Sequence, residues 1–185
     1  MVFAQPPHFK FWIESVIFIV VTYYLNNKIF LGGGGGCGDY NNGVGSNGEN
    51  GGGIIIITAA SISGNNNFIK ANGKSVIPNG GGALDGAGGG GGGGAIFVKT
   101  NAISSTFTIQ ANGGNGGNQS TGGGCVGCGG GAGTGAILTN LASFAPSSPF
   151  LIAGGAGIHL NGSCINTSYG ATSGTVNAIG PLFNK

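Results

Sequence analysis

The sequence predicts an all-β protein built from stacked repeats, and three observations lead to this prediction. A unit of about 41 residues recurs, in which an apolar, β-branched stretch is followed by a glycine-rich tract. Glycine contributes 45 of the 185 residues, yet the β-branched residues fall at fixed offsets. After Leu31 no stretch shows the apolar period of about 3.6 residues that marks a capped helix. Such a repeat is typical of a solenoid, in which each unit buries its apolar face against its neighbours.

The repeat is clearest where isoleucines recur at equal spacing. From Ile55 to Ile96 is 41 positions, and from Ile96 to Ile137 is 41 again. Equal offsets place residues at equal corners of successive units, so we expect these three side chains to stack in one ladder. A second ladder is expected at the later isoleucines of the units: Ile69, Ile109 and Ile152.

Within the first full unit the sequence predicts three short strands, at 54–58, 61–63 and 68–71. Turns at 59–60 and 64–67 would separate them, because glycine and asparagine accept the backbone conformations of tight turns. Three short strands in a repeated unit describe one rung of a short parallel β-solenoid. An antiparallel β-sandwich is the alternative architecture.

The glycine-rich tracts are predicted to be ordered insertions at one corner of each rung, at 32–53, 80–94 and 113–135. Extended helices of the polyglycine II type could lie side by side there, because only glycine lets such backbones approach closely. We therefore expect residues 88–94 to be extended and packed against another tract. A free glycine-rich linker would behave as a random coil and would have no reason to recur in register.

The domain organisation follows from this repeat. We expect residues 1–14 to be a leader and residues 15–185 to be a single glycine-rich domain. Its units are approximately 15–53, 54–94, 95–135 and 136–185.

The apolar stretch 11–31 has several interpretations. Val, Ile, Phe, Thr and Tyr dominate it, which favours a strand in a further copy of the repeat. In that alignment the run from Ile29 to Gly33 falls where the run from Ile109 to Gly113 falls. The alternatives are the apolar core of a signal peptide and a membrane anchor over residues 11–31.

Neither end of the predicted stack carries a charged or amphipathic cap, so apolar side chains and strand edges would be exposed there. We expect a homo-oligomer, a filament, or a permanent contact with another fibre or surface protein. The candidate contact residues are apolar side chains at the end of the leader and in the first unit: Phe11, Trp12, Ile17, Phe18, Ile19, Tyr23 and Tyr24.

The charge of the chain restricts its partners and its location. Six basic and four acidic residues give a net charge of +2, which is too little for an electrostatic surface that binds nucleic acid. A surface of Asn, Ser, Thr and Gly suits a protein that works outside the cell, on a cell surface or in a virion.

The four cysteines are candidates for disulfides or free thiols. Cys125 and Cys128 form a C-x-x-C motif, but a zinc site would need a second close pair, and Cys37 and Cys164 each stand alone. All four lie in or near predicted loops. In an oxidising compartment we expect disulfides within or between units, and elsewhere free thiols.

No catalytic, metal or cofactor site is predicted. No two of the acidic residues Glu14, Asp39, Glu49 and Asp85 form a pair suited to acid–base catalysis. The two histidines, His8 and His159, have no Ser or Cys partner in a recognisable motif. We therefore expect a protein that is not an enzyme and needs no cofactor.

The run Ile109-Gln110-Ala111-Asn112-Gly113-Gly114-Asn115-Gly116-Gly117 lies within a stretch, 51–155, that resembles known glycine-rich proteins. It resembles the repeats of large secreted bacterial surface proteins. It is also similar to structural proteins of tailed phages, including tip adhesins that contain a bundle of polyglycine II helices. The resemblance implies a structural or adhesive role, and it carries over no binding residue.

Taken with the repeat, this leads us to expect a non-catalytic structural protein that forms or docks on a fibre and has an assembly or adhesive role. Its partner could then be a glycan receptor. The alternatives are an ice- or glycan-binding module with a flat array of Asn and Thr, and a surface protein anchored in a membrane by residues 11–31.

Overall fold

The computed structural model describes residues 30–39, 45–77, 86–120, 125–141, 148–168, 172–176 and 179–181, and this part of the chain is strand-rich and contains no helix. This part of the chain is therefore compatible with the predicted all-β class. The leader 1–14, and the strand expected over most of 15–31, lie outside the described residues. The strands are β1 (Ile54–Lys70), β2 (Ala95–Gln110), β3 (Ala136–Thr139), β4 (Ser148–Phe150) and β5 (Ile179–Pro181).

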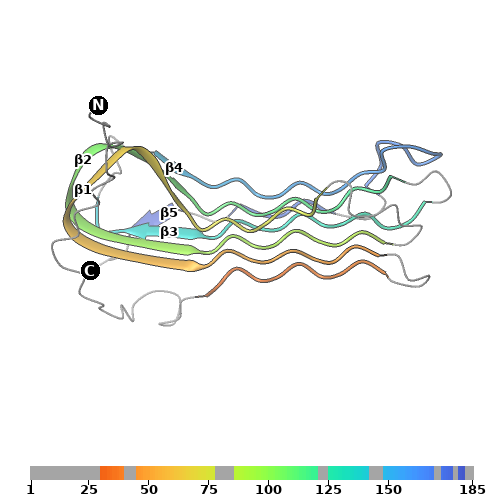
Figure 1. Ribbon diagram of the computed structural model, residues 1–185, viewed down its shortest axis with the longest axis horizontal. Coiled ribbons are helices and arrows are strands. Elements are labelled where there is room, and N and C mark those ends of the chain that lie inside the picture. Colours follow the sequence, from red (N-terminus) through yellow and green to blue (C-terminus); the bar gives the residue numbers. More distant parts are fainter. Residues whose placement is uncertain are drawn as a thin grey trace, which may run out of the picture.

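The strands form one sheet in which every pair is parallel (Figure 1). Its order is β1-β2-β3-β5, and β4 pairs with the second half of β2. Ile55 is opposite Ile96, and Ile96 is opposite Ile137, so the first predicted ladder is confirmed. The antiparallel sandwich is not the arrangement of the described residues.

The prediction of three short strands in each unit is wrong for the units 54–94 and 95–135. β1 is one strand of 17 residues and β2 one of 16. The expected turn at 64–67 is a change of register inside β1, where Asn65 and Asn66 adopt positive φ angles of 45° and 62°. An irregularity of this kind bends a strand while its neighbour continues to pair with it. The turn residues therefore curve the strand and do not end it.

The second predicted ladder is only partly correct. Ile69 is opposite Ile109 as expected, but the next residue in the ladder is Pro149. Ile152 lies beyond the sheet, and its side chain is 53% exposed. The residue opposite Ile109 in the parallel neighbouring strand is 40 positions later in the chain, at residue 149. Ile152 would pair with Ile109 only if the register shifted by three residues.

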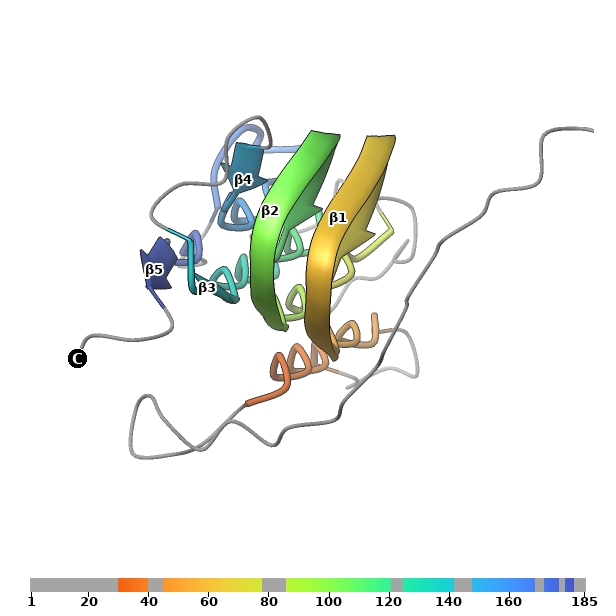
Figure 2. The same cartoon turned by 90° about the vertical axis from the view of Figure 1, so that its left-hand side faces the viewer.

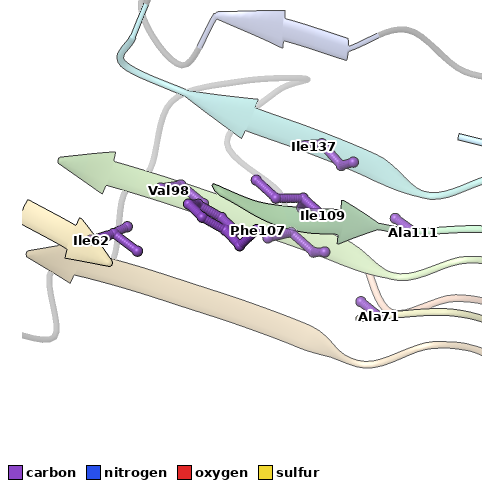
Figure 3. Close-up of a cluster of buried hydrophobic side chains, with 8 residues drawn as sticks. Ile62, Ala71, Val98, Phe107, Ile109, Ala111 and Ile137 are labelled. Atoms are coloured by element: carbon purple, nitrogen blue, oxygen red, sulfur yellow. The ribbon is translucent and has the colours of Figure 1, made fainter. Parts of the chain in front are cut away.

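The hydrophobic core lies between the two arms of the bent strands, which double back at one end of the molecule (Figure 1). Alternate residues of a strand point to opposite faces, so one face of each arm turns inward. Ile96, Ile109 and Ile137 are fully buried there, and Phe107 packs with them (Figure 3). On the outer face of the first arm a second cluster contains Ala95, Phe97, Ile56 and Leu138.

Between and beyond the strands the chain forms extended glycine segments that run side by side behind β1 and β2 (Figures 1 and 2). We number them in chain order. They are segment I (32–38), II (46–53), III (71–76), IV (87–94), V (111–119), VI (127–135), VII (151–159) and VIII (172–175).

The segments form rows that extend the sheet. Segments II, IV, VI and VIII precede β1, β2, β3 and β5, and each bonds to the next in parallel; we call them the approach row. Segments III, V and VII follow β1, β2 and β4 and form an antiparallel return row beside the first.

Segment I occupies a third layer. Both segment I and segment III hydrogen-bond to II and IV, so they must lie on opposite faces of the approach row. The alignment of 29–33 with 109–113 would have placed segment I in the return row, and this expectation is wrong. Sequence similarity between two units does not determine on which face of the row a segment packs.

Hydrogen bonds between segments recur at every third residue, which is the period of a helix with three residues per turn and no internal hydrogen bonds. Segment IV shows the full pattern, because its successive N–H groups point to three different neighbours. Gly89 and Gly92 donate to segment I, Gly90 and Gly93 to segment VI, and Gly91 and Gly94 to segment III. The expectation that 88–94 is extended and packed is therefore confirmed.

Glycine is required here mainly for close approach. A Cβ atom on Gly90 would overlap the carbonyl oxygen of Gly114 in segment V, and most glycines inside the bundle meet a neighbouring backbone in the same way. Among the described residues, the glycine with a positive φ angle is Gly162 (82°), in a loop. The segments themselves need no left-handed backbone, so it is the missing side chain that matters.

We expect Gly90→Ala to destabilise the protein by about 1–3 kcal/mol or more, because the added methyl group meets packed backbone that cannot move aside. Gly155→Ala is the matched control, since the nearest atom to its Cβ is Asn115 Oδ1 at 3.8 Å. This control should be neutral or stabilising by up to about 1 kcal/mol, through reduced freedom of the unfolded chain. Denaturant titration followed by circular dichroism measures both, and equal losses would contradict the packing.

Candidate functional site

A row of polar side chains on the return row forms the first candidate site, which we call the asparagine ladder. Each side chain accepts a hydrogen bond from a backbone N–H of the next segment. Asn72 Oδ1 accepts from Asn112 N at 2.9 Å, and Asn112 Oδ1 accepts from Ile152 N at 2.9 Å. The ladder consists of Asn72, Ser75, Asn112, Asn115 and Asn118.

The ladder follows from a three-residue pattern in the sequence. Segment V contains asparagine at 112, 115 and 118, each followed by two glycines except the last. With three residues per turn, every third side chain lies on one side of the segment, and the glycines face neighbouring backbones. The period of three in this run predicts such a ladder, although the 41-residue repeat and the composition on which the sequence predictions were based do not contain it.

The ladder satisfies backbone groups that have no backbone acceptor. In segment V, Gly113 and Gly116 donate to segment VII and Gly114 donates to segment IV. The third set of N–H groups in segment V, those of Asn112 and Asn115, points outward. Asn72 Oδ1 accepts from Asn112 N, and Ser75 Oγ accepts from Asn115 N. An unpaired N–H costs free energy, so these side chains stabilise the outer face as a further layer of backbone would.

The described charges near the ladder are sparse. Lys74 Nζ lies 2.9 Å from Glu49 Oε2 and bridges segments III and II. The lysine side chain is 59% exposed, and exposed ion pairs contribute at most about 1 kcal/mol. The outer face therefore presents mainly uncharged amide and hydroxyl groups at regular intervals.

A second candidate site lies where segment VI begins and segment VII ends, away from the sheet. A disulfide joins Cys125 and Cys164, whose Cα atoms are 5.6 Å apart. The other two cysteines are free: Cys37 is exposed and Cys128 is buried. Of the four candidate residues, the structure therefore brings two together, and the two cysteines of the C-x-x-C motif do not pair with each other.

The buried polar side chains beside this disulfide hold the loops in place. His159 is 1% exposed, and its Nε2 is 2.7 Å from the carbonyl oxygen of Val126, so this nitrogen is the donor. Gln119 pairs with His159 through the backbone and donates from Nε2 to Gly127 O at 3.3 Å. Burial raises the pKa of the Cys128 thiol, although a backbone hydrogen bond with Gln119 lowers it in part.

Several predicted features lie outside the described residues. These are Phe11, Trp12, Ile17, Phe18, Ile19, Tyr23 and Tyr24, together with His8, Glu14 and Asp85. Among the described residues, no three His, Cys, Asp or Glu side chains gather in a group that could hold a metal ion. In the same part of the chain there is no helix of the length and hydropathy that would span a membrane.

Comparison with known proteins yields no relative: no family model, no curated protein and no solved structure matches this chain.

We expect Asn112→Ala to lower the free energy of unfolding by about 0.5–1.5 kcal/mol, because Ile152 N–H loses its acceptor. Asn112→Asp keeps an oxygen in place and should retain most of the stability. Asn50→Ala, an exposed asparagine of segment II, is the control and should change little. Equal effects of the alanine substitutions at 112 and 50 in a denaturant titration would show that the ladder is not stabilising.

Reduction of the disulfide should destabilise the protein by about 4 kcal/mol, since the bond closes a loop with a sequence separation of 39. Cys125→Ser should have the same effect without reductant, and Cys37→Ser should have none. Thermal unfolding with and without dithiothreitol measures the difference. An unchanged melting temperature after confirmed reduction would contradict it.

Proposed function

We propose that the chain is a non-catalytic structural protein that works outside the cell, on a cell surface or in a virion, with an assembly or adhesive role. In this proposal the repeated units form a short parallel β-solenoid. Their insertions are packed helices of the polyglycine II type. The result is a stiff body with a strand cap at one end and disulfide-closed loops at the other.

One observation carries this proposal, namely the hydrogen bonding of the glycine segments in three directions. The N–H groups of segment IV donate to three different segments in turn, so its donors are used within the bundle. Such cross-linking resists local opening, because a segment cannot leave without breaking bonds to several neighbours. A body of this kind is suited to bearing load or holding surfaces at a fixed position.

Two further observations support a location outside the cell. A disulfide joins Cys125 and Cys164, and such bonds persist mainly in oxidising compartments. In addition, only 5% of the residues are charged, and the outer face of the return row is covered by amide and hydroxyl groups. The proposed partners are further copies of the chain, another fibre or surface protein, or a glycan.

The asparagine ladder favours a second candidate, an ice- or glycan-binding module. Its side chains recur at every third residue along a segment and again on the neighbouring segment, which gives a regular two-dimensional array. Such an array could match an ordered surface of hydroxyl groups. Assays of thermal hysteresis and glycan-array binding, with Asn115→Ala as the ladder variant, separate this candidate from the first.

The leading proposal is tested by sedimentation velocity and negative-stain electron microscopy of the full chain, together with a glycan array. We expect oligomers or filaments, or binding to a glycan-bearing surface. A soluble monomer at tens of micromolar that binds no glycan and no surface would contradict the proposal.

A further inference from the structure

Among the described residues of one copy, the third layer of the bundle is incomplete. Segment I packs over segments II and IV, where Gly36 O and Gly33 O accept bonds of 2.8 Å from Gly89 N and Gly92 N. The next position of this layer, over segments IV and VI, holds no described segment. We call it the open position.

Donor groups point into the open position. In the strand register, residues of β3 follow those of β2 by 41, so Gly130 and Gly133 of segment VI correspond to Gly89 and Gly92. The N–H groups of Gly130 and Gly133 donate to no described residue. The matching outward N–H groups of the return row are capped by asparagine and serine side chains, but no described side chain caps these two.

Four glycines of segments I and VI have no steric role in a single copy, whereas a Cβ on Gly133 would meet Thr175 O at 3.3 Å. Nothing lies within 4 Å of a Cβ placed on Gly33, Gly36 or Gly127, and the nearest atom for Gly130 is 3.6 Å away. Inside the bundle most such Cβ atoms would overlap a neighbouring backbone. Each glycine that is not needed costs about 0.5–1 kcal/mol relative to alanine. Glycine is required here if another backbone packs against these positions.

The geometry points to a second copy of this chain as the occupant, with its own segment I filling the open position. We relate the two copies by a two-fold axis that runs parallel to the segments. The approach row of the second copy then faces that of the first across the third layer, and its segments II, IV and VI follow one another in the opposite order. Segment I of each copy then lies over segments IV and VI of the other copy. Segment I runs antiparallel to the approach row of its own copy, and a rotation about this axis keeps it antiparallel to the approach row of the other copy. The contact is self-complementary, as in most symmetric dimers.

The chemistry of the two surfaces fits this pairing. Segments I and VI contain no charged residue, so their contact would bury no charge. Phe30 and Leu31 directly precede segment I in the chain and are 62% and 66% exposed, which leaves apolar surface next to the start of this segment. Backbone donors, glycine surfaces and apolar side chains are therefore continuous along it.

This inference rests on the proposed assembly role and identifies the surface that would serve it. Gly36→Arg places a charged side chain in the contact between the copies. Within one copy the substitution should be tolerated, because a Cβ atom at residue 36 meets no atom within 4 Å. Gly155→Arg, on the opposite face, is the matched control. We expect sedimentation equilibrium to show that Gly36→Arg raises the dimer dissociation constant at least about 100-fold, through like-charge contact across the axis, while the control does not change it.

A cross-linking experiment tests the direction of pairing. The axis places Cys37 of one copy at the same height as Cys37 of the other, and this thiol is exposed. A short bis-maleimide should therefore give a covalent dimer through Cys37 in the wild type, lost in both Cys37→Ser and Gly36→Arg. Circular dichroism confirms that the variants fold.

Three outcomes overturn the inference. They are a wild-type chain that is monomeric, a Gly36→Arg variant that pairs as tightly as wild type, and no cross-link although Cys37 reacts with a monofunctional maleimide. Assembly or adhesion that persists in Gly36→Arg leaves the proposed function in place while removing this surface. A wild type that neither assembles nor adheres removes both.

Discussion

The structure depends on the approach of backbones that carry no side chains between them. A three-residue helix forms no internal hydrogen bonds, so every N–H group of a glycine segment needs an acceptor on another segment. Segment IV meets this need in three directions, through Gly89, Gly90 and Gly91 and their equivalents one turn later. The entropy cost of ordering many glycines is offset only where such bonds form on all sides. The sheet supports this arrangement, because its parallel strands hold successive segments in register.

Much of the fold could be predicted because it follows from spacing. The ladder through Ile96 depends only on equal offsets and apolar character, both of which are visible in the sequence. The continuity of β1 could not be read in this way, since Asn65 and Asn66 have the composition of a turn whether the strand bends or ends. The position of Ile152 could not be predicted either. The register between β2 and β4 places Pro149 opposite Ile109, and the residue types alone do not indicate this register.

The candidate sites were less predictable, since they depend on which segments become neighbours. Four cysteines allow several pairings, and the link between Cys125 and Cys164 follows from the packing of VI beside VII. The buried roles of Gln119 and His159 likewise depend on a carbonyl contributed by a loop. The ladder at Asn112 is different, because its period of three was present in the sequence and has a direct structural meaning.

The order in which bonds can form has a consequence for synthesis of the chain. The N–H group of Gly52 donates to Gly92 O, and that of Gly93 donates to Gly133 O. Segments II and IV therefore need an acceptor segment that lies 40 residues later in the chain. Contacts between residues so far apart in the sequence slow folding, since the entropy of the intervening chain is lost before the contacts stabilise it. On the ribosome, an emerging unit therefore carries unpaired donors until the next unit has left the exit tunnel. The nascent chain should fold in steps of whole units, and translation that stops within a unit should leave its last segment unfolded.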